Sequence, residues 1–263
     1  MKIAITAAVI FCVAILMAMT GRGGGNFYVP VLIAAGATMH EAATTGQFIL
    51  VVTAVTALLI FQKYKTVDWK LALVIDPPTD IMAFVGGYYA HIFGGMALKL
   101  VFAGLLVMAS VLMLYPIQER PGENRRRLGF WRREYHNCQY TINLWLALPI
   151  TAATGLAAGM VGVSGGSFKI PLMVLVCGVP MRIAIGTSSA MVAATALMGF
   201  LGHTVSGDFN PTWTVPLAVV AVVGGLLGAK FSIKARPEKL KLIFAYTTLA
   251  AAIFMFANAI ISV

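Results

Sequence analysis

Apolar residues fill long stretches of the chain, and short polar or glycine-rich segments separate them. A helix needs about 20 mostly apolar residues to cross a bilayer. Stretches of about this length lie at 2–20, 43–61, 79–96, 98–115, 142–161, 183–203, 213–231 and 240–261. Two shorter stretches, 27–37 and 168–178, each follow a glycine-rich break. The pattern predicts membrane-spanning helices together with two short half-helices.

The order of long and short stretches occurs twice. A shift that places Gly21 on Gly162 also places Phe27 on Phe168, so the pattern Gly-Gly-x-Phe-x-x-Pro stands at equivalent places. Such self-similarity indicates an internal repeat. We expect a first transmembrane repeat over 1–115, a polar linker loop over 116–141 and a second repeat over 142–263.

The basic residues predict the orientation. If each short segment returns the chain to the side where the preceding long helix began, the two repeats are inverted. The basic linker and the Lys230–Lys241 cluster then share one side, and only Lys2 and Lys99 face the other, with Arg22 and Lys169 near the breaks left out. Cytoplasmic loops carry an excess of Lys and Arg. We therefore expect a cytoplasmic linker, an external amino terminus and the inverted repeats that many secondary transporters share.

The low content of charged residues indicates a membrane protein, and the composition argues against nucleic-acid binding and against a metal site. The chain is 60% hydrophobic and 11% charged, whereas soluble domains contain about 25% charged residues. The expected fold class is an all-α polytopic integral membrane protein surrounded by lipid. The net charge of +10 then reflects cytoplasmic loops rather than nucleic-acid binding. The three cysteines lack metal-ligand spacing, so we expect no metal or cofactor.

The two glycine breaks are the first candidate site. Free backbone groups inside a membrane are tolerated only where protein buries them or where they line a watery cavity. The start of a short helix presents unpaired NH groups and a positive dipole end, which together suit an anion. Helix packing is the alternative role for these glycines. Asn26 and Ser167 are expected N-caps, and the candidate residues are Gly24, Gly25, Asn26, Gly165, Gly166 and Ser167.

Charged and polar side chains beside the breaks complete the candidate site. Arg22 and Lys169 could neutralise a bound anion, with snorkelling to an interface as the alternative. Hydroxyl and amide groups after the short segments could donate hydrogen bonds to an oxyanion, or could serve as caps and packing groups. These are Thr45, Gln47, Thr187 and Ser188. Asp76 and Asp80 are expected to cap a helix, with proton coupling as the alternative.

These motifs resemble the TauE/SafE sulfite exporter family. The resemblance rests on Gly-Gly-x-Phe-x-x-Pro, the following short apolar segment, Gly178 and the string Ala184-Ile185-Gly186-Thr187-Ser188. It covers nearly the whole chain, although Thr44-Thr45-Gly46-Gln47 replaces the Gly-Thr-Ser string in the first repeat. The resemblance implies a permease for sulfite, sulfoacetate or other organosulfonates in the inner (cytoplasmic) membrane of a prokaryote.

The leading interpretation is therefore a secondary transporter that carries a sulfur-containing anion by alternating access, with export as the expected direction. An anion channel of the same fold is a second hypothesis, and a membrane-embedded enzyme is a third. The chain shows no nucleophile motif and no nucleotide-binding loop, so we expect no enzyme activity. A homodimer is left open.

Overall fold

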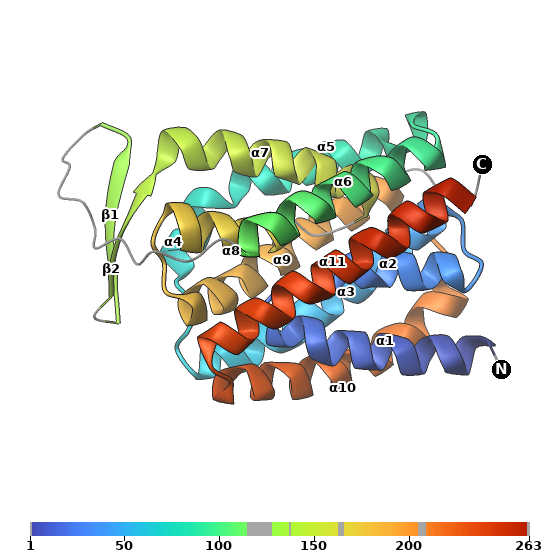
Figure 1. Cartoon of the computed structure of the whole chain (residues 1–263), viewed down its shortest axis with the longest axis horizontal. Coiled ribbons are helices and arrows are strands. Elements are labelled where there is room, and N and C mark those ends of the chain that lie inside the picture. The colour runs from blue at the N-terminus through green and yellow to red at the C-terminus, as the bar shows by residue number, and fades with distance from the viewer. Residues whose placement is uncertain (1, 115–127, 137, 163–165, 205–208, 262–263) are drawn as a thin grey trace.

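The computed structural model describes residues 2–114, 128–136, 138–162, 166–204 and 209–261, and forms an elongated bundle of helices (Figure 1). The first half contains α1 (Lys2–Met19), α2 (Gly25–Ala34), α3 (Met39–Lys63), α4 (Trp69–Ile75), α5 (Pro77–Tyr89), a 3₁₀ turn (Ala90–Ile92) and α6 (Gly95–Leu114). The second half contains β1 (Phe130–Tyr135), β2 (Cys138–Asn143), α7 (Leu144–Val161), α8 (Gly166–Pro171), a π-helical turn (Leu172–Val176), α9 (Met181–Thr204), α10 (Pro211–Lys234) and α11 (Pro237–Ile261).

A helix lies at each expected stretch, although the long helix expected over 79–96 is corrected to the shorter α5, which ends at Tyr89. Several of the helices are long and apolar enough to cross a membrane. Among the described residues, four helices meet that standard, namely α3, α7, α9 and α10. Shorter apolar stretches lie within α1 and α6, at Ala4–Met19 and Met96–Met108. Many large apolar side chains point outward, such as Leu59 and Val219, each 62% exposed. In a membrane these side chains would contact lipid.

Helix packing follows the twofold pattern of the sequence. Helix α1 packs on α10, and its counterpart α7 packs on α5. Helix α3 packs on α10, and its counterpart α9 packs on α5. The remaining large contacts join counterparts directly, α3 with α9 and α6 with α11. Each contact therefore has a mate in the other half, as expected for two copies of one unit; the exact division of the chain stays a prediction.

The two breaks pack reciprocally against the opposite halves. Gly21, at φ 70°, lies against the backbone of Ile185 in α9. Gly162, at φ 77°, lies against the backbone of Ala43 in α3. A Cβ atom at either glycine would overlap that backbone, and L residues rarely adopt these φ values. Glycine is therefore required at both positions for close contact between the halves.

One long helix is broken in the first half and continuous in the second. Helices α4 and α5 together occupy the place that α10 occupies in the other half. The break falls at Asp76, directly before Pro77 and Pro78. Proline lacks a backbone NH, and its ring clashes with the carbonyl of the preceding turn, so this sequence interrupts the helix. Helix α4 is an addition to the helices expected from the sequence.

The fold is not all-α, which corrects the sequence-based expectation. Strands β1 and β2 form an antiparallel hairpin in which Phe130 pairs with Asn143 and Tyr135 with Cys138. Side chains of β1 alternate between exposed and half-buried, which is the period of a strand that packs on one face. The hairpin covers the second part of the expected linker, and the expected boundary at residue 142 falls inside β2. Residues 115–127 lie outside the described part.

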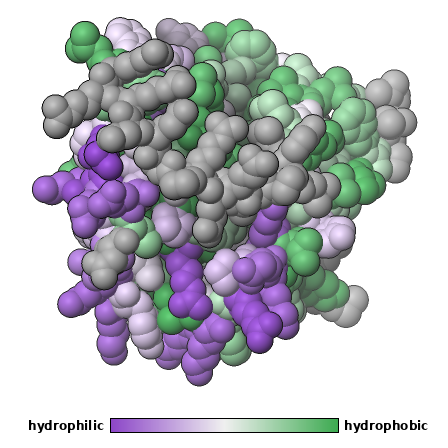
Figure 2. Space-filling model, turned by 60° about the vertical axis from the view of Figure 1, so that its left-hand side comes forward, coloured by the Kyte–Doolittle hydropathy of each residue, from purple (hydrophilic) through white to green (hydrophobic). Residues whose placement is uncertain are grey.

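The hairpin marks one end of the bundle, and both chain ends lie at the opposite end (Figure 1). Hydrophilic side chains gather over much of the hairpin end when it is turned toward the viewer, whereas apolar side chains cover an adjacent side (Figure 2). The α10–α11 turn also lies at the hairpin end, where Arg182 donates a hydrogen bond to the carbonyl of Ala235 at 3.4 Å. This polar end corresponds to the side predicted to face the cytoplasm.

Candidate functional site

The first glycine break forms a tight turn before α2. Gly23 and Gly24 both have left-handed backbone, at φ 69° and 108°, and Gly24 is the N-cap of α2. A Cβ atom on Gly24 would overlap the ring of Tyr28 one helical turn ahead. The turn therefore depends on glycine and leaves the start of α2 without a capping side chain.

The expected N-caps are corrected by the helix bounds. Helix α2 begins at Gly25, so Asn26 is the second residue of the helix rather than its N-cap. Helix α8 begins at Gly166, so Ser167 likewise lies inside its helix. Gly165 lies outside the described residues. Both helices start two residues earlier than expected, and at α2 a glycine, Gly24, occupies the cap position.

Arg22 is buried against α11 and does not snorkel to an interface. It is 1% exposed, and Nη2 donates to the carbonyl of Phe244 and to Oγ1 of Thr247, each at 3.1 Å. Nη1 donates to Oγ1 of Thr248, and Nε donates to Oγ1 of Thr20 at 3.2 Å. The guanidinium also lies over the Phe244 ring, 3.4 Å from its centroid. These contacts fix the orientation of the guanidinium beside the first break.

Lys169 is also fully buried, and it forms an ion pair. Its Nζ contacts the carboxylate of Asp76 and donates to Oγ1 of Thr195 at 2.6 Å. The Thr195 hydroxyl in turn lies 2.7 Å from Oδ1 of Asp80. The Asp76 side chain makes no capping hydrogen bond to α5, so its expected capping role is wrong. Lys169 and both acids were candidate residues in the sequence, but they lie too far apart along the chain for a local pattern to connect them.

The four candidate hydroxyl and amide residues are buried but not gathered in one place. Thr45 in α3 shares a hydrogen bond with Thr214 in α10 at 3.2 Å. Gln47 packs against Gly199 of α9. Thr187 accepts a hydrogen bond from the backbone NH of Asp68 at 2.9 Å, near the hairpin. Thr45 and Thr187 therefore join helices, which agrees with the packing role that the sequence left open.

Ser188 differs from Thr45 and Thr187. Its hydroxyl is fully buried and has no hydrogen-bond partner among the residues that the structure describes. On the same face of α9, Ile185 contacts Gly21 and Val192 lies beside Gly23, one turn to either side of Ser188. The unpartnered hydroxyl therefore stands on the helix face that packs against the first glycine break. A buried polar group without a partner is costly and calls for an explanation.

One cavity among the described residues is too apolar to suit an anion. It has a volume of about 420 Å³ and lies between α1, α2 and α11, where apolar side chains such as Val9, Phe27 and Phe254 line it. An apolar crevice that opens beside exposed apolar helices suits a lipid acyl chain. The described residues also contain no group of three or more His, Cys, Asp or Glu that could hold a metal ion.

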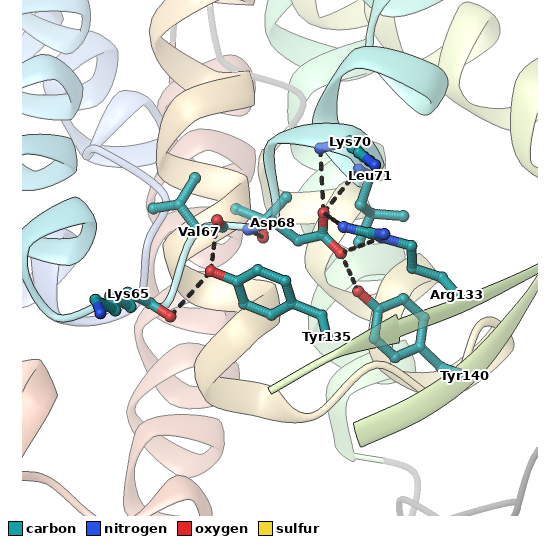
Figure 3. Close-up of polar contacts among 9 residues, drawn as sticks. Lys65, Val67, Asp68, Lys70, Leu71, Arg133, Tyr135 and Tyr140 are labelled. Atoms are coloured by element: carbon teal, nitrogen blue, oxygen red, sulfur yellow. Dashed lines mark hydrogen bonds and ion pairs between the residues drawn. The ribbon is translucent and has the colours of Figure 1, made fainter. Parts of the chain in front are cut away.

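A second cluster of charged and polar side chains, centred on Asp68, connects the hairpin to the helices (Figure 3). The sequence did not predict this cluster. Asp68 is the N-cap of α4 and accepts hydrogen bonds from the NH groups of Lys70 and Leu71. Arg133 from β1 and the Tyr140 hydroxyl from β2 also donate to its carboxylate. Burial alone would raise the pKa of Asp68, but these hydrogen bonds hold that pKa below its ordinary value.

The same contact changes the proton affinity of Tyr140. Burial and the neighbouring Asp68 carboxylate raise the pKa of its hydroxyl, which therefore stays protonated as a donor. On the same face of the hairpin, the Tyr135 hydroxyl shares its hydrogen between the carbonyls of Lys65 and Val67, at 3.1 and 3.0 Å. Together these bonds attach both strands to the α3–α4 turn.

Comparison with known proteins adds an independent line of evidence. The chain matches the family described as "Sulfite exporter TauE/SafE" over residues 6–255. The probable membrane transporter protein YunE of Bacillus subtilis is 25% identical over 86% of this chain and 86% of its own. A probable membrane transporter protein of Xylella fastidiosa is 26% identical over 92% of this chain and 90% of its own. Another, from Methanocaldococcus jannaschii, is 19% identical over 93% of this chain and 92% of its own. No solved structure matches the chain.

Proposed function

Because the chain belongs to the TauE/SafE family of sulfite exporters and is a multi-pass membrane transporter rather than an enzyme, we propose that it exports a small sulfur-containing anion. Sulfite, sulfoacetate and other organosulfonates are the proposed substrates, carried across the cytoplasmic membrane of a prokaryote. The proposed mechanism is alternating access between two inverted repeats, with the polar hairpin end in the cytoplasm.

We place the anion between the two glycine breaks. The observation that carries this proposal is the buried Ser188 hydroxyl, which lacks a partner and lies on the face of α9 that contacts Gly21 and Gly23. A sulfonate or sulfite oxygen could accept its hydrogen bond. The uncapped start of α2 would supply backbone NH groups and a positive dipole end at the same break.

The charge of the substrate would be balanced in part by Arg22, beside the first break. Its guanidinium is held by oxygens of α11, so it could act as a fixed electrostatic partner at short range. Lys169 is engaged with Asp76, which makes it a weaker source of free positive charge. Replacing Arg22 by Gln should therefore weaken binding of a dianion such as sulfite more than binding of a monosulfonate.

Binding by purified protein provides the first test. Sulfite, sulfate, thiosulfate, taurine and sulfoacetate would be titrated into the reconstituted protein, with Ser188→Ala beside Ser189→Ala as a matched control. The Ser189 hydroxyl already donates to the Ile185 carbonyl at 3.2 Å, so it has no free bond to offer. We expect Ser188→Ala to weaken binding about tenfold, the effect of losing one hydrogen bond to a charged ligand, and Ser189→Ala to change it little.

Transport in proteoliposomes separates the proposed carrier from an anion channel of the same fold. A carrier shows saturable flux and exchanges labelled for unlabelled anion across the membrane, whereas a channel passes current without obligatory exchange. If the protein binds none of the five anions, the proposed substrate class is wrong. If the flux does not saturate, the carrier mechanism is wrong.

A further inference from the structure

Four side chains from three helices form a buried cluster that the proposed anion site leaves unused. Lys169 of α8 and Thr195 of α9 are 0% exposed, Asp76 at the α4–α5 break is 4% exposed, and Asp80 of α5 is half-buried. Lys169 contacts Asp76 and Thr195, and Thr195 contacts Asp80 at 2.7 Å. The cluster is therefore continuous from the buried lysine to a carboxylate that reaches the surface.

The charges of this cluster do not balance when both acids are ionised. Two carboxylates then face one ammonium group, which leaves one negative charge. Helix α7, which packs against α5, has no ionisable residue. On α9, Arg182 bonds with Ala235 at one end and His203 bonds with the Gly159 carbonyl at the other, at 2.8 Å. On α4, Lys70 is exposed.

The neighbouring elements therefore bring no further positive group to the cluster within the residues whose side chains are described. An unbalanced charge inside a membrane protein is costly. Thr79, between the two acids on α5, is also fully buried, and its hydroxyl has no hydrogen-bond partner among the described residues.

We propose that Asp76, Asp80, Lys169 and Thr195 form the binding site for a proton that is coupled to anion transport. This inference rests on the proposed transport function and names its coupling ion. One proton taken up by the acid pair gives a neutral cluster, with the proton on a carboxylate oxygen and no bond broken elsewhere. Asp80, the half-buried acid, exchanges this proton with water.

Thr195 gives the cluster two hydrogen-bond states. Its oxygen accepts from Lys169, and its single hydroxyl hydrogen can reach either Oδ1 of Asp80 or the carbonyl of Met191, at 2.7 and 2.8 Å. Ionised Asp80 attracts this hydrogen more strongly than a carbonyl does. Protonation of Asp80 releases the hydroxyl toward Met191 and changes the contacts of Lys169.

The proton site and the proposed anion site share two helices. Lys169 lies in α8, immediately after the second glycine break. Ser188 and Thr195 lie on one face of α9, seven positions apart, which corresponds to about 10 Å along a helix. A change in the contacts of Lys169 therefore acts on the elements that surround the anion. The separation also lets the two ligands bind without direct contact.

The other half of the chain shows that the fold does not need this charge cluster. The repeat places Tyr28 at the position of Lys169, and the buried Tyr28 hydroxyl bonds with Thr53 at 3.0 Å. The part of α10 that corresponds to the acid pair, residues 217–222, contains only Leu, Ala and Val. Equivalent packing is thus achieved without an ionisable residue, which favours a functional role for the cluster.

Infrared spectroscopy tests the proton site without any substrate. Reconstituted protein would be stepped from mildly alkaline to mildly acidic pH, where ordinary exposed carboxylates stay ionised. We expect a carboxylic-acid C=O band to appear in the wild type and in Glu238→Gln, which removes an exposed acid. Asp80→Asn should lose that band. If the band persists unchanged in both Asp80→Asn and Asp76→Asn, the proposal is wrong.

Transport then tests coupling, with sulfoacetate as the probe because its charge is constant near neutral pH. Wild-type proteoliposomes should move sulfoacetate in response to a pH gradient and also exchange it without a gradient. In Asp80→Asn the ratio of gradient-driven flux to exchange should fall by an order of magnitude or more. Thr195→Val, which removes only the bridging hydroxyl, should also lower that ratio. It replaces Asp80→Asn as the test variant if Asp80→Asn does not fold.

The outcomes separate the two proposals. An unaltered ratio in both variants would overturn proton coupling while leaving anion transport intact. Absence of sulfoacetate exchange in the wild type would count against the proposed substrate, and the infrared result would still decide the proton site.

Discussion

Arg133 donates two hydrogen bonds to the Asp68 carboxylate, from Nε to Oδ2 at 2.9 Å and from Nη2 to Oδ1 at 3.0 Å. Asp68 is fully buried and Arg133 is partly exposed, so the pair lies at the edge of the helical bundle. A bidentate ion pair fixes the relative orientation of the two side chains as well as the distance between them. It therefore holds the hairpin in one orientation over the α3–α4 turn.

Removing the Tyr140 hydroxyl should loosen this attachment. Tyr140→Phe takes one donor from the buried Asp68 carboxylate, and a hydrogen bond to a charged group contributes about 1.5–3 kcal/mol. We expect a lower melting temperature in detergent and faster proteolysis of the hairpin. Gln139→Ala, at an exposed position of the same strand, is the control. Equal melting temperatures for both variants would show that the bond contributes little.

The hairpin should detach only in acid. Because the folded pKa of Asp68 lies below its ordinary value, its contribution to stability is complete above that value, about 4, and is lost as pH falls toward the folded pKa. We expect the fluorescence of Trp131, in β1, to stay constant from about pH 8 to about pH 5 and to change below about pH 4. Asp68→Asn should remove this transition. A transition near neutral pH would contradict the assignment.

Ser188→Ala should stabilise the empty protein while it weakens anion binding. The substitution removes a buried hydroxyl without a partner, and such a group costs about 1–3 kcal/mol. We expect a higher melting temperature without ligand and a smaller increase on addition of sulfite. Ser189→Ala should show neither change. A lower melting temperature for Ser188→Ala would indicate that its hydroxyl has a structural partner.

Glycine substitutions should divide into two classes. Gly162→Ala forces a Cβ atom into Ala43 at a φ value that L residues rarely adopt, so we expect little folded protein. Gly25→Leu and Gly166→Leu change the first residues of α2 and α8 and should instead abolish transport in folded protein. Gly104→Ala, which meets no atom within 4 Å, is the control. Size-exclusion profiles and transport rates distinguish the classes; normal transport by Gly166→Leu would assign that glycine to packing.

Cysteine labelling should place the hairpin in the cytoplasm. In a background without Cys12, Cys138 and Cys177, an impermeant reagent added to intact cells should leave Gln139→Cys unlabelled. Thr212→Cys, at the opposite end of the bundle, should react. The expectation follows from the basic residues of the linker and of the α10–α11 turn. Labelling of position 139 from outside would reverse the predicted orientation. Arg126, in the same linker, lies outside the described residues.

Helix positions and the repeated packing were predictable because membrane helices are long, apolar and interrupted by glycine. The hairpin was not predictable from apolar periodicity, because the inward-facing side of β1 alternates Trp131, Arg133 and Tyr135, and the arginine interrupts its apolar pattern. The break at Asp76 was visible as Asp-Pro-Pro but was assigned to a helix start rather than to an interruption. The sequence thus predicted the positions of the helices better than the hairpin and the helix break that connect them.

The site was predicted in its residues more than in its contacts. The breaks identified Arg22 and Lys169, but burial and partners depend on helices far away in the sequence. Arg22 bonds with residues of α11, and Lys169 bonds with Asp76 and Thr195. No local pattern connects such positions. Ser188 was named with three similar residues, and only its missing partner distinguishes it from Thr45 and Thr187.

The unbroken α10 has a consequence for comparing members of this family. It shows which apolar residues can take the place of the ionic cluster without loss of packing, so a relative could lose its acids gradually and still fold. Under the proposed coupling, such a relative would have become a passive exchanger. Acids at positions 76 and 80 would then distinguish proton-driven transporters from passive exchangers, independently of the anion that they carry.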